Sequence, residues 1–135
     1  MNNNLKNFIK KIIKEELVKE ADSFKKLDVS IKITYDIQMT QHAIERKMRH
    51  LDDEGVIIKD KDIIDLIDKA LPKLTTDMVK NTLNVGDEMV LTSKSNNLNV
   101  VGILKSGNGN EINFIIKTIM IKPGFKPDST KQYFF

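Results

Sequence analysis

The 135 residues suggest one domain, and 40% hydrophobic with 30% charged residues is ordinary for a globular protein. The absence of cysteine excludes disulfides, thiolate nucleophiles and cysteine-based zinc sites, and it fits a reducing cytoplasm. A formal net charge of +3 permits nucleic-acid binding without requiring it. No apolar run approaches the length of a membrane span, and the N-terminal sequence lacks the features of a signal peptide, so no membrane partner is expected.

The first part of the chain, over about residues 5–83, is expected to be mainly helical. Its beginning, Leu5–Ser23, has the i, i+3, i+4, i+7 spacing of an amphipathic helix. Strict alternation over Val29–Ile37 then predicts one half-buried strand. The apolar residues of the predicted first helix are Leu5, Phe8, Ile9, Ile12, Ile13 and Leu17.

A further helix is predicted after an Asp-Asp-Glu-Gly turn at residues 52–55. Asp60 or Asp62 is expected to cap it, and it should run through about Ala70 before Pro72 stops it. Residues 76–83 are left open between a loop and a further helical turn.

From Glu88 the pattern changes to strands. Residues 89–92, 99–105 and 111–121 are rich in Val, Ile and Leu, and an Asn-Gly pair at 108–109 is a strong hairpin signal. A short last strand is expected near residues 132–135. The chain is therefore predicted to be a single α+β domain over residues 1–135, with N-terminal helices followed by an antiparallel β-meander over about 88–135.

The stretch Thr40–Leu51 contains both arginines and both histidines of the chain. Thr40 is a plausible N-cap, and at about 100° per residue four side chains share roughly a quarter of the helix circumference. Guanidinium groups match phosphate bidentately and imidazole titrates near neutrality, so this stripe suits a phosphate-rich ligand. The stripe consists of His42, Arg46, Arg49 and His50, and Ile44, Met48 and Leu51 on the other side are expected to pack inward.

The motif H-A-x-x-R at His42–Arg46 follows the predicted strand and precedes Gly55-Val56, the acid-capped helix and the meander. This order resembles the RelE-like group of small nucleases, including its BrnT-like members. Locally, YDIQMTQHAIERKMRH resembles the bacteriophage RegB-type endoribonucleases. The resemblance covers residues 29–70 by motif and the rest by element order. It implies a RelE/RegB-like fold and a role for His42 and Arg46 at the scissile phosphate of RNA.

Other members of that family's site are not fixed by the resemblance. RegB-like enzymes use a second histidine further along the chain, whereas His50 lies on the same predicted helix as His42. An acid from the N-terminal helix also belongs to the site, and Glu15 and Glu16 are candidates by order. Tyr133 stands where RelE-type relatives often carry a catalytic tyrosine or histidine.

Metal-free RNA cleavage requires a base, a cation at phosphorus and an acid for the leaving oxygen. His42 is expected to be the base, because the positive end of a helix disfavours the protonated imidazole, and Arg46 is expected to clamp the phosphate. The acid is left open among His50, Glu16 and Tyr133. Arg49, His50 and Lys47 are expected to bind RNA, and no metal or cofactor is expected.

The favoured function is a metal-independent endoribonuclease that cleaves RNA by 2′-hydroxyl attack. It would be phage-encoded and would act in the host cytoplasm on RNA such as mRNA, with ribosome dependence and oligomeric state left open. The alternative is a non-catalytic RNA-binding regulator, or a phage structural or interaction protein. In that reading, His42 bonds its own backbone, His50 pairs with the helix dipole and Tyr133 packs in the sheet.

Overall fold

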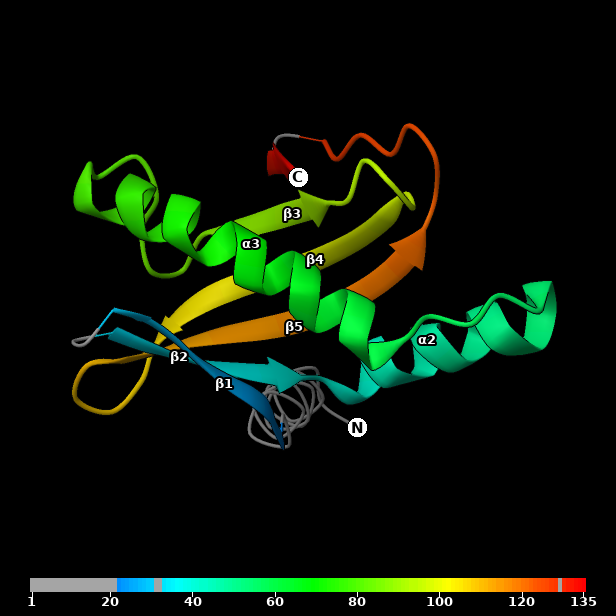
Figure 1. Cartoon of the computed structure of the whole chain (residues 1–135), viewed down its shortest axis with the longest axis horizontal. Coiled ribbons are helices and arrows are strands. Elements are labelled where there is room, and N and C mark those ends of the chain that lie inside the picture. Colours follow the sequence, from blue (N-terminus) through cyan, green and yellow to red (C-terminus); the bar gives the residue numbers. More distant parts are fainter. Residues whose placement is uncertain (1–21, 31–32, 129) are drawn as a thin grey trace, which may run out of the picture.

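The computed structural model describes residues 22–30, 33–128 and 130–135, which form a six-stranded sheet and two helices (Figure 1). The helices are α2 (Gln41–Glu54) and α3 (Asp60–Val79). The strands are β1 (Asp22–Ser30), β2 (Ile33–Met39), β3 (Glu88–Thr92), β4 (Leu98–Ser106), β5 (Glu111–Ile121) and β6 (Lys131–Phe134).

The sheet has the order β1-β2-β5-β4-β3-β6 and is mixed. The meander β3–β4–β5 is antiparallel, as predicted. However, β2 pairs parallel with β5, and β6 pairs parallel with β3. The described chain also begins with two strands, and both described helices follow them. The predicted class, N-terminal helices followed by an antiparallel RelE/RegB-like meander, is therefore wrong.

Two strands occupy the region in which one was predicted. β1 and β2 pair antiparallel, with Leu27 opposite Tyr35. The predicted alternation holds in β2, where Tyr35 and Ile37 are buried. The predicted helix Leu5–Ser23 lies outside the described residues except for its last two residues, which belong to β1.

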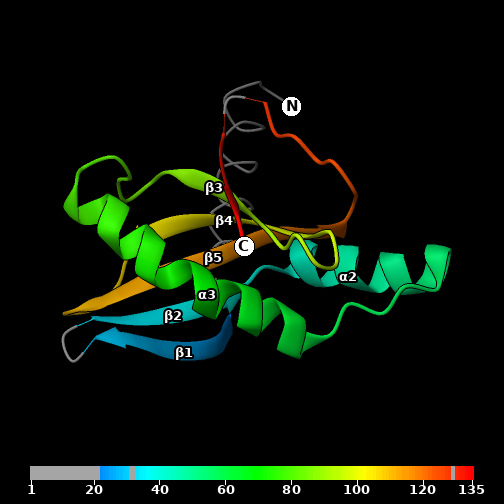
Figure 2. The ribbon, with the colours of Figure 1, turned by 45° about the horizontal axis from the view of Figure 1, so that its top comes forward.

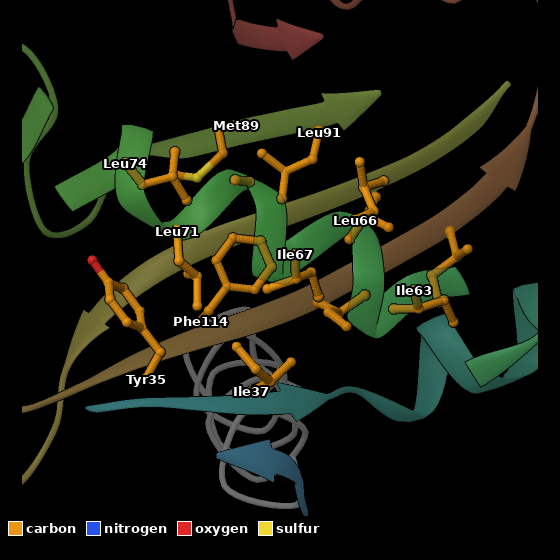
Figure 3. Close-up of a cluster of buried hydrophobic side chains, with 14 of the residues drawn as sticks. Tyr35, Ile37, Ile63, Leu66, Ile67, Leu71, Leu74, Met89, Leu91 and Phe114 are labelled. Carbon is orange, nitrogen blue, oxygen red and sulfur yellow. The ribbon is translucent and has the colours of Figure 1, made fainter. Parts of the chain in front are cut away.

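α3 lies across one face of the sheet (Figure 2). Its apolar stripe packs on the inward side chains of the central strands, and together they form the hydrophobic core (Figure 3). The buried residues of α3 are Ile63, Leu66, Ile67, Ala70, Leu71 and Leu74, and their partners from the sheet include Tyr35, Ile37, Met89, Leu91 and Phe114.

α3 continues past Pro72 to Val79, contrary to the prediction that Pro72 ends it. A proline inside a helix costs about 3 kcal/mol, because it lacks the backbone N–H and crowds the preceding turn. Leu71 and Leu74, on either side of it, are both fully buried. Each contributes about 1.5–3 kcal/mol by burial, so packing on the sheet offsets the proline.

A partly buried pair of hydroxyl groups links α3 to β2. The Thr75 hydroxyl donates to the Leu71 carbonyl oxygen (2.8 Å), and it lies 2.6 Å from the Tyr35 hydroxyl. Because the one proton of Thr75 goes to Leu71, Tyr35 donates to Thr75. Burial raises the pKa of Tyr35, so this tyrosine stays neutral and keeps its proton for the bond.

Candidate nucleic-acid interface

α2 begins where β2 ends and projects beyond the sheet (Figure 1). Thr40 caps it as predicted, because its hydroxyl oxygen accepts from the Ala43 backbone N–H (3.2 Å). The Thr40 N–H donates to the Ile116 carbonyl oxygen (3.1 Å), which ties the helix start to β5. At the other end Gly55 adopts the left-handed conformation that closes the helix (φ 66°).

The orientation predicted for α2 is wrong. Ile44, Met48 and Leu51 were expected to pack inward, but they are 40%, 50% and 42% exposed. The side toward the protein instead carries the fully buried Ala43 and the half-buried Arg46. The helix is thus rotated about its own axis by roughly a third of a revolution relative to the predicted orientation. The small side chain of Ala43 allows a close approach to the core, and most of α2 lies past the end of the sheet (Figure 1).

The apolar side of α2 faces a groove instead of the core. Ile44 and Met48 line this groove, of about 260 Å³, together with Phe24 of β1 and Met39 of β2. Lys47 lies at its rim, where its ammonium pairs with the carboxylate of Asp60 at the start of α3. Lys47, predicted to bind RNA, is therefore held in an ion pair within the protein.

The accessible cationic stripe of α2 consists of His42, Arg46 and Arg49. His42 and Arg49 are exposed and Arg46 is half-buried. Among the side chains that the structure describes, neither arginine has an ion-pair partner within 4.0 Å. His50 is half-buried on the side of the helix that faces the protein. The structure thus keeps three of the predicted site residues together, within reach of a ligand.

Tyr133 lies elsewhere. Its hydroxyl donates to the Asp77 carboxylate (2.8 Å). The pKa of Tyr133 is raised mainly by burial and secondly by this carboxylate. The bond from Tyr133 in turn lowers the pKa of Asp77, which also pairs with Lys73 (3.2 Å). Asp60, which Lys47 contacts, and Asp77 are 17 residues apart on α3, or about 25 Å. Tyr133 and the cationic stripe therefore do not share a site, and Glu16 lies outside the described residues.

A polar pocket between α3 and the β3–β4 turn was not predicted. It has a volume of about 190 Å³, and it combines residues of α3 with residues 93–96 and with Phe135, so no local pattern could reveal it. The pocket is lined by Asp62, Asp65, Leu66, Lys69, Ser93, Ser95, Asn96 and Phe135.

In residues 22–30, 33–128 and 130–135 no three His, Asp or Glu side chains gather as metal ligands. Neither α2 nor α3 is long and apolar enough to cross a bilayer.

The geometry of α2 therefore offers phosphate-binding groups, and neither arginine forms an ion pair with a described acid, although the exposed Glu45 lies one turn before Arg49 on the same helix. A scan of protein-family models, a search of curated proteins and a search of solved structures found no match to this chain.

Proposed function

We propose that this protein binds RNA through the cationic stripe of α2, acting in the cytoplasm. The observation that carries the proposal is the placement of Arg46 and Arg49 one turn apart on a projecting helix, without ion-pair partners among the described side chains. Side chains at i and i+3 are neighbours on a helix, so two guanidinium groups can engage one phosphate or two successive ones. His42, in the first turn, adds a hydrogen-bond donor.

The charges along α2 favour binding at its N-terminal part. In the sequence, residues 52–54 at the end of this segment are Asp, Asp and Glu, whereas residues 41–51 contain one acid, Glu45. The N-terminal end carries the positive end of the helix dipole, which attracts phosphate. An RNA strand should therefore contact the first three turns and turn away from the last.

The Arg46→Gln/Arg49→Gln variant is expected to bind a single-stranded RNA more weakly than the wild-type protein. Each lost phosphate contact should reduce the slope of log affinity against log salt by about 0.7, so the double variant should lose about 1.4. Fluorescence anisotropy with a labelled oligonucleotide, titrated at several salt concentrations, measures both quantities. The matched control is Lys94→Gln/Lys126→Gln, which removes two charges from exposed lysines that do not belong to α2.

Equal losses in the two double variants would show that binding depends on net charge and not on the stripe. A wild-type protein that does not bind RNA at low salt would overturn the proposal. The exposed apolar residues of α2 would then favour a protein-interaction role, since exposed apolar patches mark such surfaces.

RNA cleavage is the second candidate function, favoured by the position of the exposed His42 one turn before the half-buried Arg46 on α2. The histidine would take the 2′-hydroxyl proton, and the arginine would stabilise the charge that gathers on phosphorus. The proton for the leaving 5′-oxygen would come from Glu16, from His50 or from water.

RNA incubated with the protein in EDTA and analysed for 2′,3′-cyclic phosphate ends tests this candidate. His42→Ala should abolish cleavage, and Arg46→Lys should retain only part of it. Intact RNA from the wild-type protein would reject it and leave binding alone.

A further inference from the structure

The face of the sheet opposite α3 carries an apolar surface, which we call the outer patch. Along β3, β4 and β5 each patch member is next to at least one residue of the core under α3, so the patch members point the other way. Neighbouring strands bring them together, with Val90 opposite Val101 and Ile103 opposite Ile115. The outer patch consists of Val90, Val101, Ile103, Ile115 and Met120.

The outer patch is removed from water, although neither described helix covers it. Val90 is 1% exposed and Ile115 is 4% exposed, and the remaining members are half-buried. The Thr118 hydroxyl, beside them on β5, is buried and has no hydrogen-bond partner. α3 lies on the opposite face (Figure 2), and α2 extends past the end of the sheet (Figure 1). Something other than these helices must therefore cover the patch.

The chain enters the sheet beside this patch. Asp22, the first residue of β1, pairs with Met39, and Met39 pairs with Ile116, the neighbour of Ile115. The Ser23 hydroxyl donates to Asp36 (2.5 Å), whose neighbours Tyr35 and Ile37 point into the core, so this contact lies on the outer face. Two strand spacings, about 10 Å, separate β1 from β5. Residues 18–21 can span about 13 Å, so the segment before them can reach the outer patch.

Residues 5–17 have the sequence that such a surface requires. Their apolar residues form one helical stripe, and Lys11 and Lys14 fall on the opposite side. Thirteen helical residues extend about 20 Å, enough to cross β3, β4 and β5. We propose that residues 5–17 form a helix that docks its apolar stripe on the outer patch of the same chain, so that helices cover both faces of the sheet.

Spin labels on single cysteines test this contact in the full-length protein, because the chain has no cysteine of its own. Lys105 is exposed next to the core residue Leu104, so a label on Lys105→Cys lies on the outer face. Exposed Lys69 on α3 provides the matched position on the opposite face, as Lys69→Cys. The amide NMR signals of residues 5–17 should lose most of their intensity with the Lys105→Cys label and keep it with the Lys69→Cys label. A Glu88→Cys label provides a second outer position if the first disturbs the fold.

Two substitution pairs then test the stripe. Ile9→Gln/Ile12→Gln should abolish the intensity loss, and Lys11→Gln/Lys14→Gln, on the other side of the helix, should leave it unchanged. The docked helix is excluded if both outer labels leave the signals intact, if the Lys69→Cys label broadens them, or if the isoleucine variant keeps the effect. Broadening that appears only when labelled and isotope-enriched molecules are mixed would assign the patch to a second copy, and that result also overturns the proposal.

Discussion

Ile67→Ala is expected to lower the free energy of unfolding by about 2–5 kcal/mol, while Met48→Ala is expected to change it by less than about 1 kcal/mol. Ile67 is fully buried at the centre of α3, between the helix and the sheet (Figure 3). Its truncation removes apolar contacts and leaves a cavity that the surrounding strands can only partly fill. Met48 lies half in solvent at the groove, so its truncation opens no closed cavity.

Urea denaturation of the two variants and the wild-type protein measures the difference in the free energy of unfolding. The three curves are fitted with a common slope of this free energy against urea concentration. The sequence pattern of α2 predicts the opposite for Met48, which on that pattern would be a core residue. A loss of about 2 kcal/mol or more in Met48→Ala would therefore place the apolar side of α2 against protein, contrary to the structure. Arg49→Ala, an exposed truncation on the same helix, provides the reference for a side chain without packing.

Local sequence patterns identified the strands well, but not their partners. β5 has the predicted bounds, and β3 and β4 lie within one residue of them, because alternating β-branched residues and an Asn-Gly pair are local signals. The parallel pairs β2–β5 and β3–β6 join segments separated by about 75 and about 40 residues. Nothing within either segment specifies such a partner, so the mixed sheet could not be predicted.

Two further errors, a missed strand and a wrong helix end, have physical causes. β1 was missed because DSFKKLDVS has no regular alternation, and its register with β2 shifts near Phe24 and near Val29. The sequence predicts a helix end at Pro72 from the local cost of proline, whereas the burial of Leu71 and Leu74 that offsets this cost depends on the sheet.

The candidate site was predictable in composition and not in orientation. The clustering of Arg46, Arg49 and His42, and the Thr40 cap, could be read from one short stretch. The side of α2 that packs depends on what lies beside it, and here the small Ala43 makes the closest contact. The sequence also could not show that the hydroxyl of Tyr133 donates a hydrogen bond to Asp77, which lies near the C-terminal end of α3.

Gly102→Ala is expected to destabilise the protein by about 1–3 kcal/mol, although removing a glycine normally stabilises by about 0.4–1 kcal/mol through the unfolded chain. Gly102 lies on β4 where its register with β5 shifts, directly over the ring of Phe114. A methyl group at this position would lie 2.4 Å from the ring carbon Cζ, far inside van der Waals contact. Phe114 is fully buried beneath α3, so the ring cannot move away without displacing other core residues (Figure 3).

A double-mutant cycle with Phe114→Leu separates this clash from other effects of alanine. The smaller leucine vacates the space that the added methyl group needs. Phe114→Leu should therefore cost less in the Gly102→Ala background than in the wild-type protein, with a coupling energy of about 0.5–3 kcal/mol. Lys105→Ala, an exposed change on the same strand, should be neutral within about 0.5 kcal/mol. Additive losses, measured by urea denaturation, would mean that Gly102 is required by the strand backbone itself and not by the ring of Phe114.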